Sequence, residues 1–405
     1  MLDSYRRVLG IPGTLPFTLA GLAARLPISM VSLGIVLLVQ EVTGSYGLAG
    51  TYAATFVLAQ AALALFHGRL LDRVGQGRVL ATATTVSSAA LALMLVAVLE
   101  DWPVALAYAG AAVAGATLPQ VGSAVRARWA HVLTGRARDL QTAYAFEGVV
   151  DEAVFIIGPI LVTVLATTFH PATGLTVALL VGLVGTWAFS LQRGTEPPVL
   201  ARRDATTGAG VAMPWGVVVP LTVVSLALGT LFGAAEVITL AFATEHDAKQ
   251  WTGGLLALWS LGSLVAGILT GVVHWRIGVE VRVRRGAIGM ALAMVPLALI
   301  DEVWLMGAVL LLGGLAISPT LISTMSLVEQ VVPRARLTEA MGVLHSGLLA
   351  GVAPGAALSG ALVDRFGTGA AYAVPIGAGV LAAVVAQTLR GPRFAPSAGP
   401  DLLDA

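Results

Sequence analysis

The chain has 405 residues, of which 57% are hydrophobic and only 11% are charged. Soluble domains carry about 25% charged residues, so this composition is not that of a protein built for water. The net charge of +1 gives no reason to expect a nucleic-acid partner, and the lack of cysteine excludes disulfides and thiolate metal sites.

Long apolar runs follow one another through the chain. A helix needs about 20 mainly apolar residues to cross the hydrocarbon core of a bilayer, which is roughly 30 Å thick. We predict twelve transmembrane helices rather than strands, because lipid cannot satisfy the open edges of a sheet. The predicted spans are residues 14–40, 45–67, 79–99, 103–125, 142–168, 172–192, 214–243, 251–273, 285–301, 303–326, 339–362 and 370–390.

The basic residues indicate an orientation. If the N-terminus is cytoplasmic and the twelve spans alternate, Lys249 and Arg365 alone fall outside, Arg25 falls within a span, and the rest of the 23 basic residues fall inside. Basic residues favour the cytoplasmic side of a membrane. We therefore predict a multi-pass protein of the cell membrane, embedded in the lipid bilayer, with both termini in the cytoplasm.

One long polar connection divides the spans into two groups of six. It is rich in proline, glycine and arginine, which is typical of a linker. We predict an N-terminal six-helix bundle over residues 1–192, a cytoplasmic linker over 193–213, a C-terminal six-helix bundle over 214–390 and a cytoplasmic tail over 391–405. Paired halves of this kind surround a midplane site in secondary transporters.

Three spans contain two glycines separated by three residues: GTLFG (229–233), GILTG (267–271) and GVAPG (351–355). Small residues at this spacing let helices approach closely in a membrane, so we predict that these glycines lie at helix contacts. A role as hinges is the alternative.

The join between the second and third spans carries the sequence GRLLDRVGQGR, residues 68–78. It resembles the signature loop of the major facilitator superfamily, G-x-L-x-D-R-x-G followed by basic residues. Gln76 and Gly77 stand where the family often has arginine and lysine. The residues that match the signature are Gly68, Leu70, Asp72, Arg73, Gly75 and Arg78.

The resemblance implies an all-α membrane fold of twelve helices in two six-helix bundles, and a switching role for this loop. In the family, the aspartate that Asp72 matches interacts with the start of helix eleven, here near Thr338 and Glu339, and stabilises one cavity-open state. A carboxylate favours the positive N-terminus of a helix, and a tight join needs glycine. The alternative is that Arg73 and Arg78 only set the topology.

The fifth span carries several charges. Glu147 and Asp151 are four residues apart and share a helix face, whereas Glu152 is rotated from Asp151 by about 100°. Charges at this depth normally face the bundle interior or a water-filled cavity. Gly158 and Pro159 resemble a fragment of the family's antiporter-associated motif in helix five, whose other glycines are missing here, so export by antiport is a hypothesis.

Arg25 lies near the middle of the first span and needs a carboxylate partner there. Helices one and five are neighbours in the family's fold, so we predict that Arg25 pairs with Asp151 or Glu147. Three carboxylates and one arginine form either a site for a proton or a polar solute, or a static ion pair. Glu236, in the seventh span, faces the central cavity or reaches the outer headgroups.

The chain contains no P-loop and no H-E-x-x-H or G-x-S-x-G motif, so we expect neither ATP-driven transport nor an enzyme, and no cofactor or metal. We expect a monomeric secondary active transporter that moves a small amphiphilic solute by alternating access, by proton-coupled efflux. One alternative is a proton-coupled importer or a facilitator for a small metabolite. Another is a membrane sensor or scaffold that transports nothing.

Overall fold

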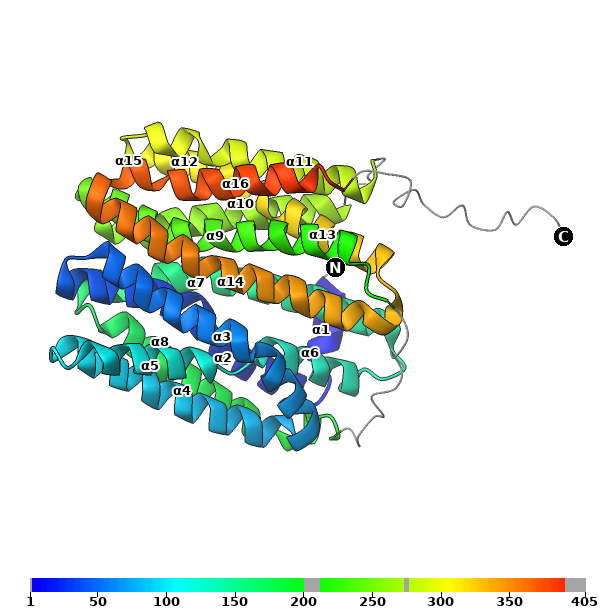
Figure 1. The fold of residues 1–405 in the computed structure, drawn as a ribbon. Coiled ribbons are helices and arrows are strands. Elements are labelled where there is room, and N and C mark those ends of the chain that lie inside the picture. The colour runs from blue at the N-terminus through cyan, green and yellow to red at the C-terminus, as the bar shows by residue number, and fades with distance from the viewer. Residues whose placement is uncertain (1, 200–211, 273–276, 390–405) are drawn as a thin grey trace.

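The computed structural model describes residues 2–199, 212–272 and 277–389, and the described residues form helices and connections without strands. The helices lie roughly side by side along one direction (Figure 1). The first set of helices, here the N-terminal set, comprises α1 (Leu2–Leu9), α2 (Thr14–Thr43), α3 (Tyr46–Val74), α4 (Gln76–Leu99), α5 (Val104–Ala116), α6 (Val121–Val132), α7 (Ala137–Thr168) and α8 (Thr173–Leu191).

The C-terminal set follows the linker. It comprises α9 (Trp215–Glu245), α10 (Thr252–Val272), α11 (Val279–Met294), α12 (Val303–Gly314), α13 (Ile317–Val331), α14 (Arg334–Phe366), α15 (Thr368–Ala371) and α16 (Ala373–Ala386), with short 3-10 turns at Arg193–Thr195, Lys249–Trp251 and Pro296–Leu299. The pairs α5–α6, α12–α13 and α15–α16 each make one crossing. The fold is therefore the expected all-α membrane fold, with twelve crossings in two sets of six.

Eleven crossings in the described part of the chain are long and apolar enough to span a membrane. The ninth is α11, whose 16 residues begin with a turn that carries Arg282, Arg284 and Arg285. The predicted ninth span, residues 285–301, is therefore placed too late. Long arginine side chains let a helix start before its apolar part, and Pro296 favours an end to the helix just before it.

The predicted fourth span, residues 103–125, is also wrong in its extent. The structure has two helices with a break at residues 117–120, and the second continues to Val132. Pro119 lies in the break, where its missing N–H and fixed ring interrupt helical hydrogen bonding. This break lengthens the fourth crossing and changes which of its residues lie inside the bundle.

The join between α3 and α4 is tighter than predicted. The helix α3 continues through the predicted loop to Val74, and α4 begins at Gln76. Gly75 alone separates them, with a φ of 98° that only glycine adopts readily. The expectation that this join needs glycine is confirmed at Gly75.

The two ends of the helix array differ. We name the end near α1 and the end of α16 the terminal face, and the other end the opposite face (Figure 1). Several hydrogen bonds and an ion pair join described residues of the two sets in the half toward the opposite face. These bonds join Ser32 to Glu236, Asp364 to residues 45–47, and Lys249 to Gln40 and Glu41.

The contact between α3 and α14 is closest near the opposite face as well. A Cβ at Gly50 would lie 2.4 Å from the carbonyl oxygen of Ala356, and a Cβ at Gly360 would lie 2.2 Å from that of Tyr46. Toward the terminal face α3 is less covered, and its Phe66 is 56% exposed. The two sets are therefore held together mainly at the opposite face.

Glycines bring α9 and α14 into contact within the C-terminal set. A Cβ at Gly229 or Gly233 would lie within 2.0 Å of a carbonyl oxygen of α14, and a Cβ at Gly351 or Gly355 within 2.3 Å of one of α9. The prediction that these glycines pack helices is confirmed for two of the three pairs. In the third pair Gly267 lies close to Ser318, while the surroundings of Gly271 are not described.

We expect Gly351→Ala to destabilise the protein. The new methyl group would lie 1.9 Å from the oxygen of Leu226, a backbone atom that cannot move without shifting α9. The free energy of unfolding should fall by about 1–3 kcal/mol. Melting in detergent, followed by tryptophan fluorescence, measures this, with Gly377→Ala as the control because nothing lies within 4 Å of a Cβ there. Equal melting temperatures for the two variants would contradict the packing role.

Candidate functional site

Three helices bring four charged side chains together inside the N-terminal set. Arg25 comes from α2, Arg126 from α6, and Glu147 and Asp151 from α7. We name these four residues the ion cluster. It contains two cations and two anions, so it is balanced in charge if every group is ionised.

Arg25 binds both carboxylates of the cluster. Its Nη1 donates to Oδ1 of Asp151 at 2.7 Å, and its Nη2 lies 2.7 Å from Oε2 of Glu147. The Nε atom donates to the carbonyl oxygen of Gly21, one turn earlier in α2. Arg25 is only 5% exposed, so these bonds replace its lost contact with water. The prediction that Arg25 pairs with Asp151 or Glu147 is confirmed, and it pairs with both.

Arg126 completes the cluster from the other side of Asp151. Its Nη2 donates to Oδ2 of Asp151 at 2.5 Å, so each oxygen of this carboxylate binds a different arginine. The side chains of Asp151 and Arg126 are 32% and 39% exposed, whereas Glu147 is fully buried. The cluster thus has a closed part at Glu147 and an accessible part at Asp151.

In the predicted topology Arg126 comes directly after the fourth span, residues 103–125, and lies on the cytoplasmic side. The break at residues 117–120 and the extension of α6 place it inside the set instead. The expected cluster of three carboxylates and one arginine is therefore wrong. No hydrogen bond joins Glu152 to another described residue, and Arg126 balances the second negative charge.

Trp129 is a further member that the sequence analysis missed. Its Nε1 donates to Oε1 of Glu147 at 2.8 Å, and its ring packs edge-on against Phe17 at 4.8 Å between centroids. Tryptophan lies one turn after Arg126 on α6, so both face α7. The two oxygens of Glu147 therefore have one partner each, Arg25 and Trp129.

We expect Trp129→Phe to weaken the N-terminal set. Phenylalanine keeps the aromatic packing but leaves Oε1 of Glu147 without its donor. Loss of a hydrogen bond to a buried charged group costs about 1.5–3 kcal/mol. Unfolding in detergent measures the loss, and Trp102→Phe is the control because Trp102 is 43% exposed. If both variants unfold alike, the bond to Glu147 contributes nothing to stability.

Glu236 lies away from the ion cluster, at the contact between the two sets. Its Oε2 accepts a hydrogen bond from the Oγ of Ser32, 2.5 Å away on α2. Of the two places expected for Glu236, the structure shows the interior one. No ion pair joins Glu236 to a cation among the described residues, so its only polar partner found there is a neutral hydroxyl.

Gly158 and Pro159 lie at two different helix contacts. A Cβ at Gly158 would lie 2.0 Å from the Oγ of Ser29, which donates to the carbonyl oxygen of Val154. On the other side, a Cβ at Gly253 would lie 2.2 Å from the carbonyl oxygen of Pro159. The pair therefore lies where α7 contacts both α2 and, across the two sets, α10.

The residues of the signature loop lie at the terminal face. A Cβ at Gly68 would have open space around it, with no atom within 4 Å, and Arg73 and Arg78 are exposed. The side chain of Asp72 lies outside the described residues, so its expected contact with the start of helix eleven stays a prediction. Thr338, the other predicted partner, is outside them too, while Glu339 pairs with Arg336 at 2.7 Å.

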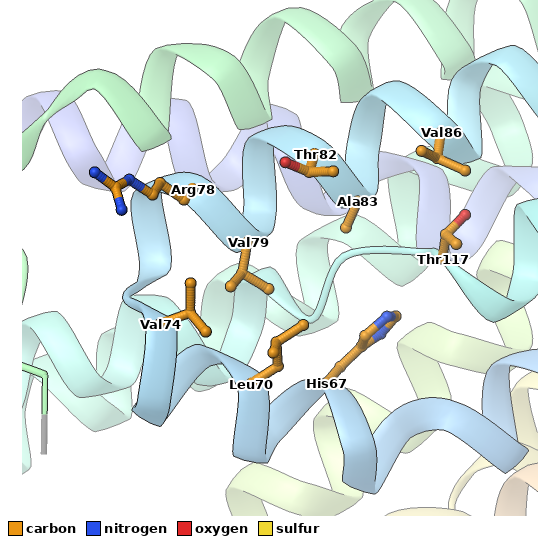
Figure 2. Close-up of a pocket in the computed structure, with 9 residues that line it drawn as sticks. All are labelled: His67, Leu70, Val74, Arg78, Val79, Thr82, Ala83, Val86 and Thr117. Atoms are coloured by element: carbon orange, nitrogen blue, oxygen red, sulfur yellow. The ribbon is translucent and has the colours of Figure 1, made fainter. Parts of the chain in front are cut away.

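A cavity of about 300 Å³ lies beside this loop (Figure 2). Figure 2 shows His67 and Leu70 on α3, Arg78 and Val79 on α4, and Thr117 at the break after α5 around it. Its lining is largely apolar and contains no carboxylate. The cavity lies within the N-terminal set, apart from the ion cluster and from Glu236.

Arg128 ties the start of the linker to the N-terminal set. It is fully buried over the ring of Phe189, 3.8 Å from the centroid, and donates to Gln76, Gln192 and Thr195. Arg128 is therefore buried inside the set, where α4 begins and α8 ends. Residues 200–211 of the predicted linker and 391–405 of the predicted tail lie outside the described residues.

No group of three metal-binding side chains occurs in the part of the chain that the structure describes. The site is thus a set of ionisable and hydroxyl side chains: the ion cluster at the junction of α2, α6 and α7, and Glu236 with Ser32 at the contact between the sets. Chemically, these groups can bind and release protons and can bind a polar part of a solute.

Comparisons with known proteins agree with this arrangement. The sequence profile of the Major Facilitator Superfamily matches residues 17–313 and 223–403. The multidrug resistance protein MdtG of Dickeya zeae is 32% identical over 127 residues, which are 30% of this chain and 30% of that protein. MdtG of Serratia proteamaculans is 28% identical over 167 residues, 40% of this chain and 39% of that protein.

Solved structures share the fold over most of the chain. The POT family transporter PepTSo has a TM-score of 0.74 at 11% identity, covering 93% of this chain and 97% of that one. A bacterial homologue of the iron transporter ferroportin, in its inward-facing state, has a TM-score of 0.71 at 14% identity, covering 93% and 98%. Identities this low establish the architecture alone, and the aligned curated relatives are each matched over less than half of their length.

Proposed function

Because the chain belongs to the major facilitator superfamily and is a membrane transporter rather than an enzyme, we propose that it exports a small amphiphilic solute by proton-coupled alternating access. Two bundles that rock about a midplane site would expose that site to each side in turn. The proposal rests on the positions of the ionisable groups in an otherwise apolar helix array. The ion cluster lies inside the N-terminal set, and Glu236 lies at the contact between the two sets.

The distribution of the basic residues supports an orientation of the protein in the membrane. The loops at the terminal face carry most of the arginines, so this face is cytoplasmic by the positive-inside rule. The contacts between the sets lie toward the opposite face, which is then the outer one. We therefore assign this structure to a state that is closed to the outside.

Asp151 and Arg126 are the accessible part of the ion cluster. Charged groups that are partly exposed inside a membrane face water or a polar ligand rather than lipid. We assign to them the polar part of the solute. Glu147 is closed off between Arg25 and Trp129 and holds the cluster in place.

Glu236 is the group that we assign to proton coupling. An ionised carboxylate held between helices needs a countercharge or water, whereas a protonated one does not. Its bond to Ser32 links its protonation to the contact between α2 and α9. Glu152 is the second candidate, since no described cation pairs with it.

Export is supported by two observations. The aligned relatives are named multidrug resistance proteins, although the match covers 30% to 40% of this chain. Gly158 and Pro159 in α7 resemble part of an antiporter motif, and Pro159 lies at the contact between the sets, against α10. Import of a small metabolite by proton symport is the second candidate function, since the same carboxylates serve either direction.

Transport by purified protein in liposomes tests the function, with ethidium as an amphiphilic fluorescent probe. Antiport accumulates ethidium in vesicles with an acidic lumen, because protons leave as the probe enters. Symport needs an alkaline lumen. Nigericin, which collapses the gradient, and protein-free vesicles are the controls. The proposal of efflux is wrong if a panel of amphiphilic probes moves only with an alkaline lumen, and a sensor or scaffold moves none.

A further inference from the structure

The signature motif of the loop between α3 and α4 occurs a second time in this chain. Residues 360–367 read GALVDRFG, and residues 68–75 read GRLLDRVG. Both fit G-x-L-x-D-R-x-G, so glycine, leucine, aspartate, arginine and glycine recur at the same five positions. The second copy lies at the end of α14, on the opposite face, where the sequence analysis assigned only Arg365.

The two copies have the same local structure. The first ends α3 at Val74 and the second ends α14 at Phe366. The glycine that follows each helix has a positive φ and an extended ψ, 98° and 149° at Gly75, and 82° and 175° at Gly367. In each case the next helix begins at the following residue. The repeated sequence therefore encodes one helix ending, used at both ends of the molecule.

The helices α3 and α14 lie side by side in different sets (Figure 1), and they run in opposite directions. The motif at the end of α3 is therefore at the terminal face, which is the face where α14 begins. The motif at the end of α14 is at the opposite face beside the start of α3. The second copy is thus placed to bring its aspartate, Asp364, to the N-terminus of α3.

At the opposite face this contact is made. The carboxylate of Asp364 accepts hydrogen bonds from Ser45 Oγ at 2.7 Å, from the backbone N–H of Tyr46 at 2.8 Å and from that of Gly47 at 2.7 Å. The first N–H groups of a helix have no partner within it, and they carry partial positive charge. Gly47 suits this approach, since a Cβ there would lie 2.9 Å from Oδ2.

We propose that Asp364 is a latch residue that holds the two sets together at the opposite face. Its carboxylate caps α3 from the other set, so the contact exists only while that face is closed. The ion pair of Lys249 with Glu41 supports the same closure nearby. The latch rests on the proposed function, because it assigns to one state of the transport cycle a contact that the other state must break.

Distances between spin labels test the latch in the full-length protein. The chain has no cysteine, so introduced cysteines are labelled without background. Phe169→Cys and Leu299→Cys place labels on exposed positions of the two sets at the opposite face, and Leu191→Cys and Val219→Cys do so at the terminal face. Double electron–electron resonance in liposomes then reports the population of each state.

Asp364→Asn should raise the ratio of outward-open to outward-closed molecules about tenfold, because charge-assisted bonds to the start of α3 are lost. The distance at the opposite face should lengthen and that at the terminal face should shorten. Ser45→Ala, which removes one donor and keeps the carboxylate, should shift the same distances less. Asp301→Asn is the matched control, an exposed acid at the same face without a hydrogen bond to another described residue.

Unchanged distances in Asp364→Asn overturn the latch, as does an equal shift in Asp301→Asn. If Asp364→Asn does not fold, the Ser45→Ala distances decide in its place. Ethidium uptake by the unlabelled wild-type protein is measured in parallel. If the distances shift but no ethidium is taken up, the latch is supported and the proposed function is contradicted. If ethidium is taken up but the distances do not shift, the proposed function is supported and the latch is contradicted.

Discussion

Arg25→Met is expected to abolish transport and to lower the free energy of unfolding by about 3–5 kcal/mol. Methionine fills much of the same space but removes the only cation bound to Glu147 and one of two bound to Asp151 among the described residues. Glu147 is fully buried, so its charge would remain in the protein interior without compensation. Unfolding in detergent and ethidium uptake in liposomes measure the two effects.

Two further variants make this prediction sharp. Arg69→Met removes an exposed arginine for which no ion pair with a described residue is found, and it should change neither property. Arg25→Met combined with Glu147→Gln restores the balance of charge, leaving Arg126 with Asp151. This double variant should recover part of the stability but not transport. If Arg25→Met and Arg69→Met have the same melting temperature, the ion cluster does not stabilise the fold.

Glu236→Gln is expected to reduce proton-driven uptake of ethidium to the level of protein-free vesicles while exchange of the probe continues. Glutamine has nearly the same shape and can still bond to Ser32, but it cannot gain or lose a proton. Coupling to the pH gradient should therefore fail, whereas opening and closing of the sets should not. Uptake with an acidic lumen measures coupling, and counterflow without a gradient measures exchange.

The controls for this variant separate three assignments. Glu100→Gln, at an exposed carboxylate at the end of α4, should leave both assays unchanged. Glu152→Gln tests the second carboxylate that lacks a described cation. If Glu152→Gln loses uptake and Glu236→Gln keeps it, proton coupling belongs to α7 rather than to the contact of α2 with α9. If both keep it, neither group carries the proton.

The number and order of the crossings could be predicted from the chain alone. Each depends on a local property, a run of apolar residues long enough for the bilayer, and the arginines between the runs follow the same local rule. The pairing of Arg25 could be predicted because an arginine near the midplane needs a carboxylate, and the resemblance to the family implied that the fifth span, with Glu147 and Asp151, is its neighbour. Gly75 was predictable for a similar reason, since so short a join leaves few conformations.

The composition of the site could not be predicted in this way. A break of a few residues at Pro119 decides whether Arg126 lies at a membrane surface or beside Asp151, and composition does not reveal which. Trp129 and Ser32 carry no charge, so nothing local distinguishes them from packing residues until their partners on other helices are known. The second copy of the signature, residues 360–367, is present in the sequence. Its contact with another helix follows only from the packing of α3 beside it.

Local chemistry therefore settled the class of protein, its twelve helices and the need for a buried ion pair, since water, lipid and charge act on each segment separately. The packing of the helices decided which residues form the ion cluster, which oxygen binds which nitrogen, and at which face the two sets contact each other. Several of these contacts join residues more than a hundred positions apart, such as Arg25 with Asp151 and Ser45 with Asp364. Such contacts form only when the helices pack against one another in the folded protein.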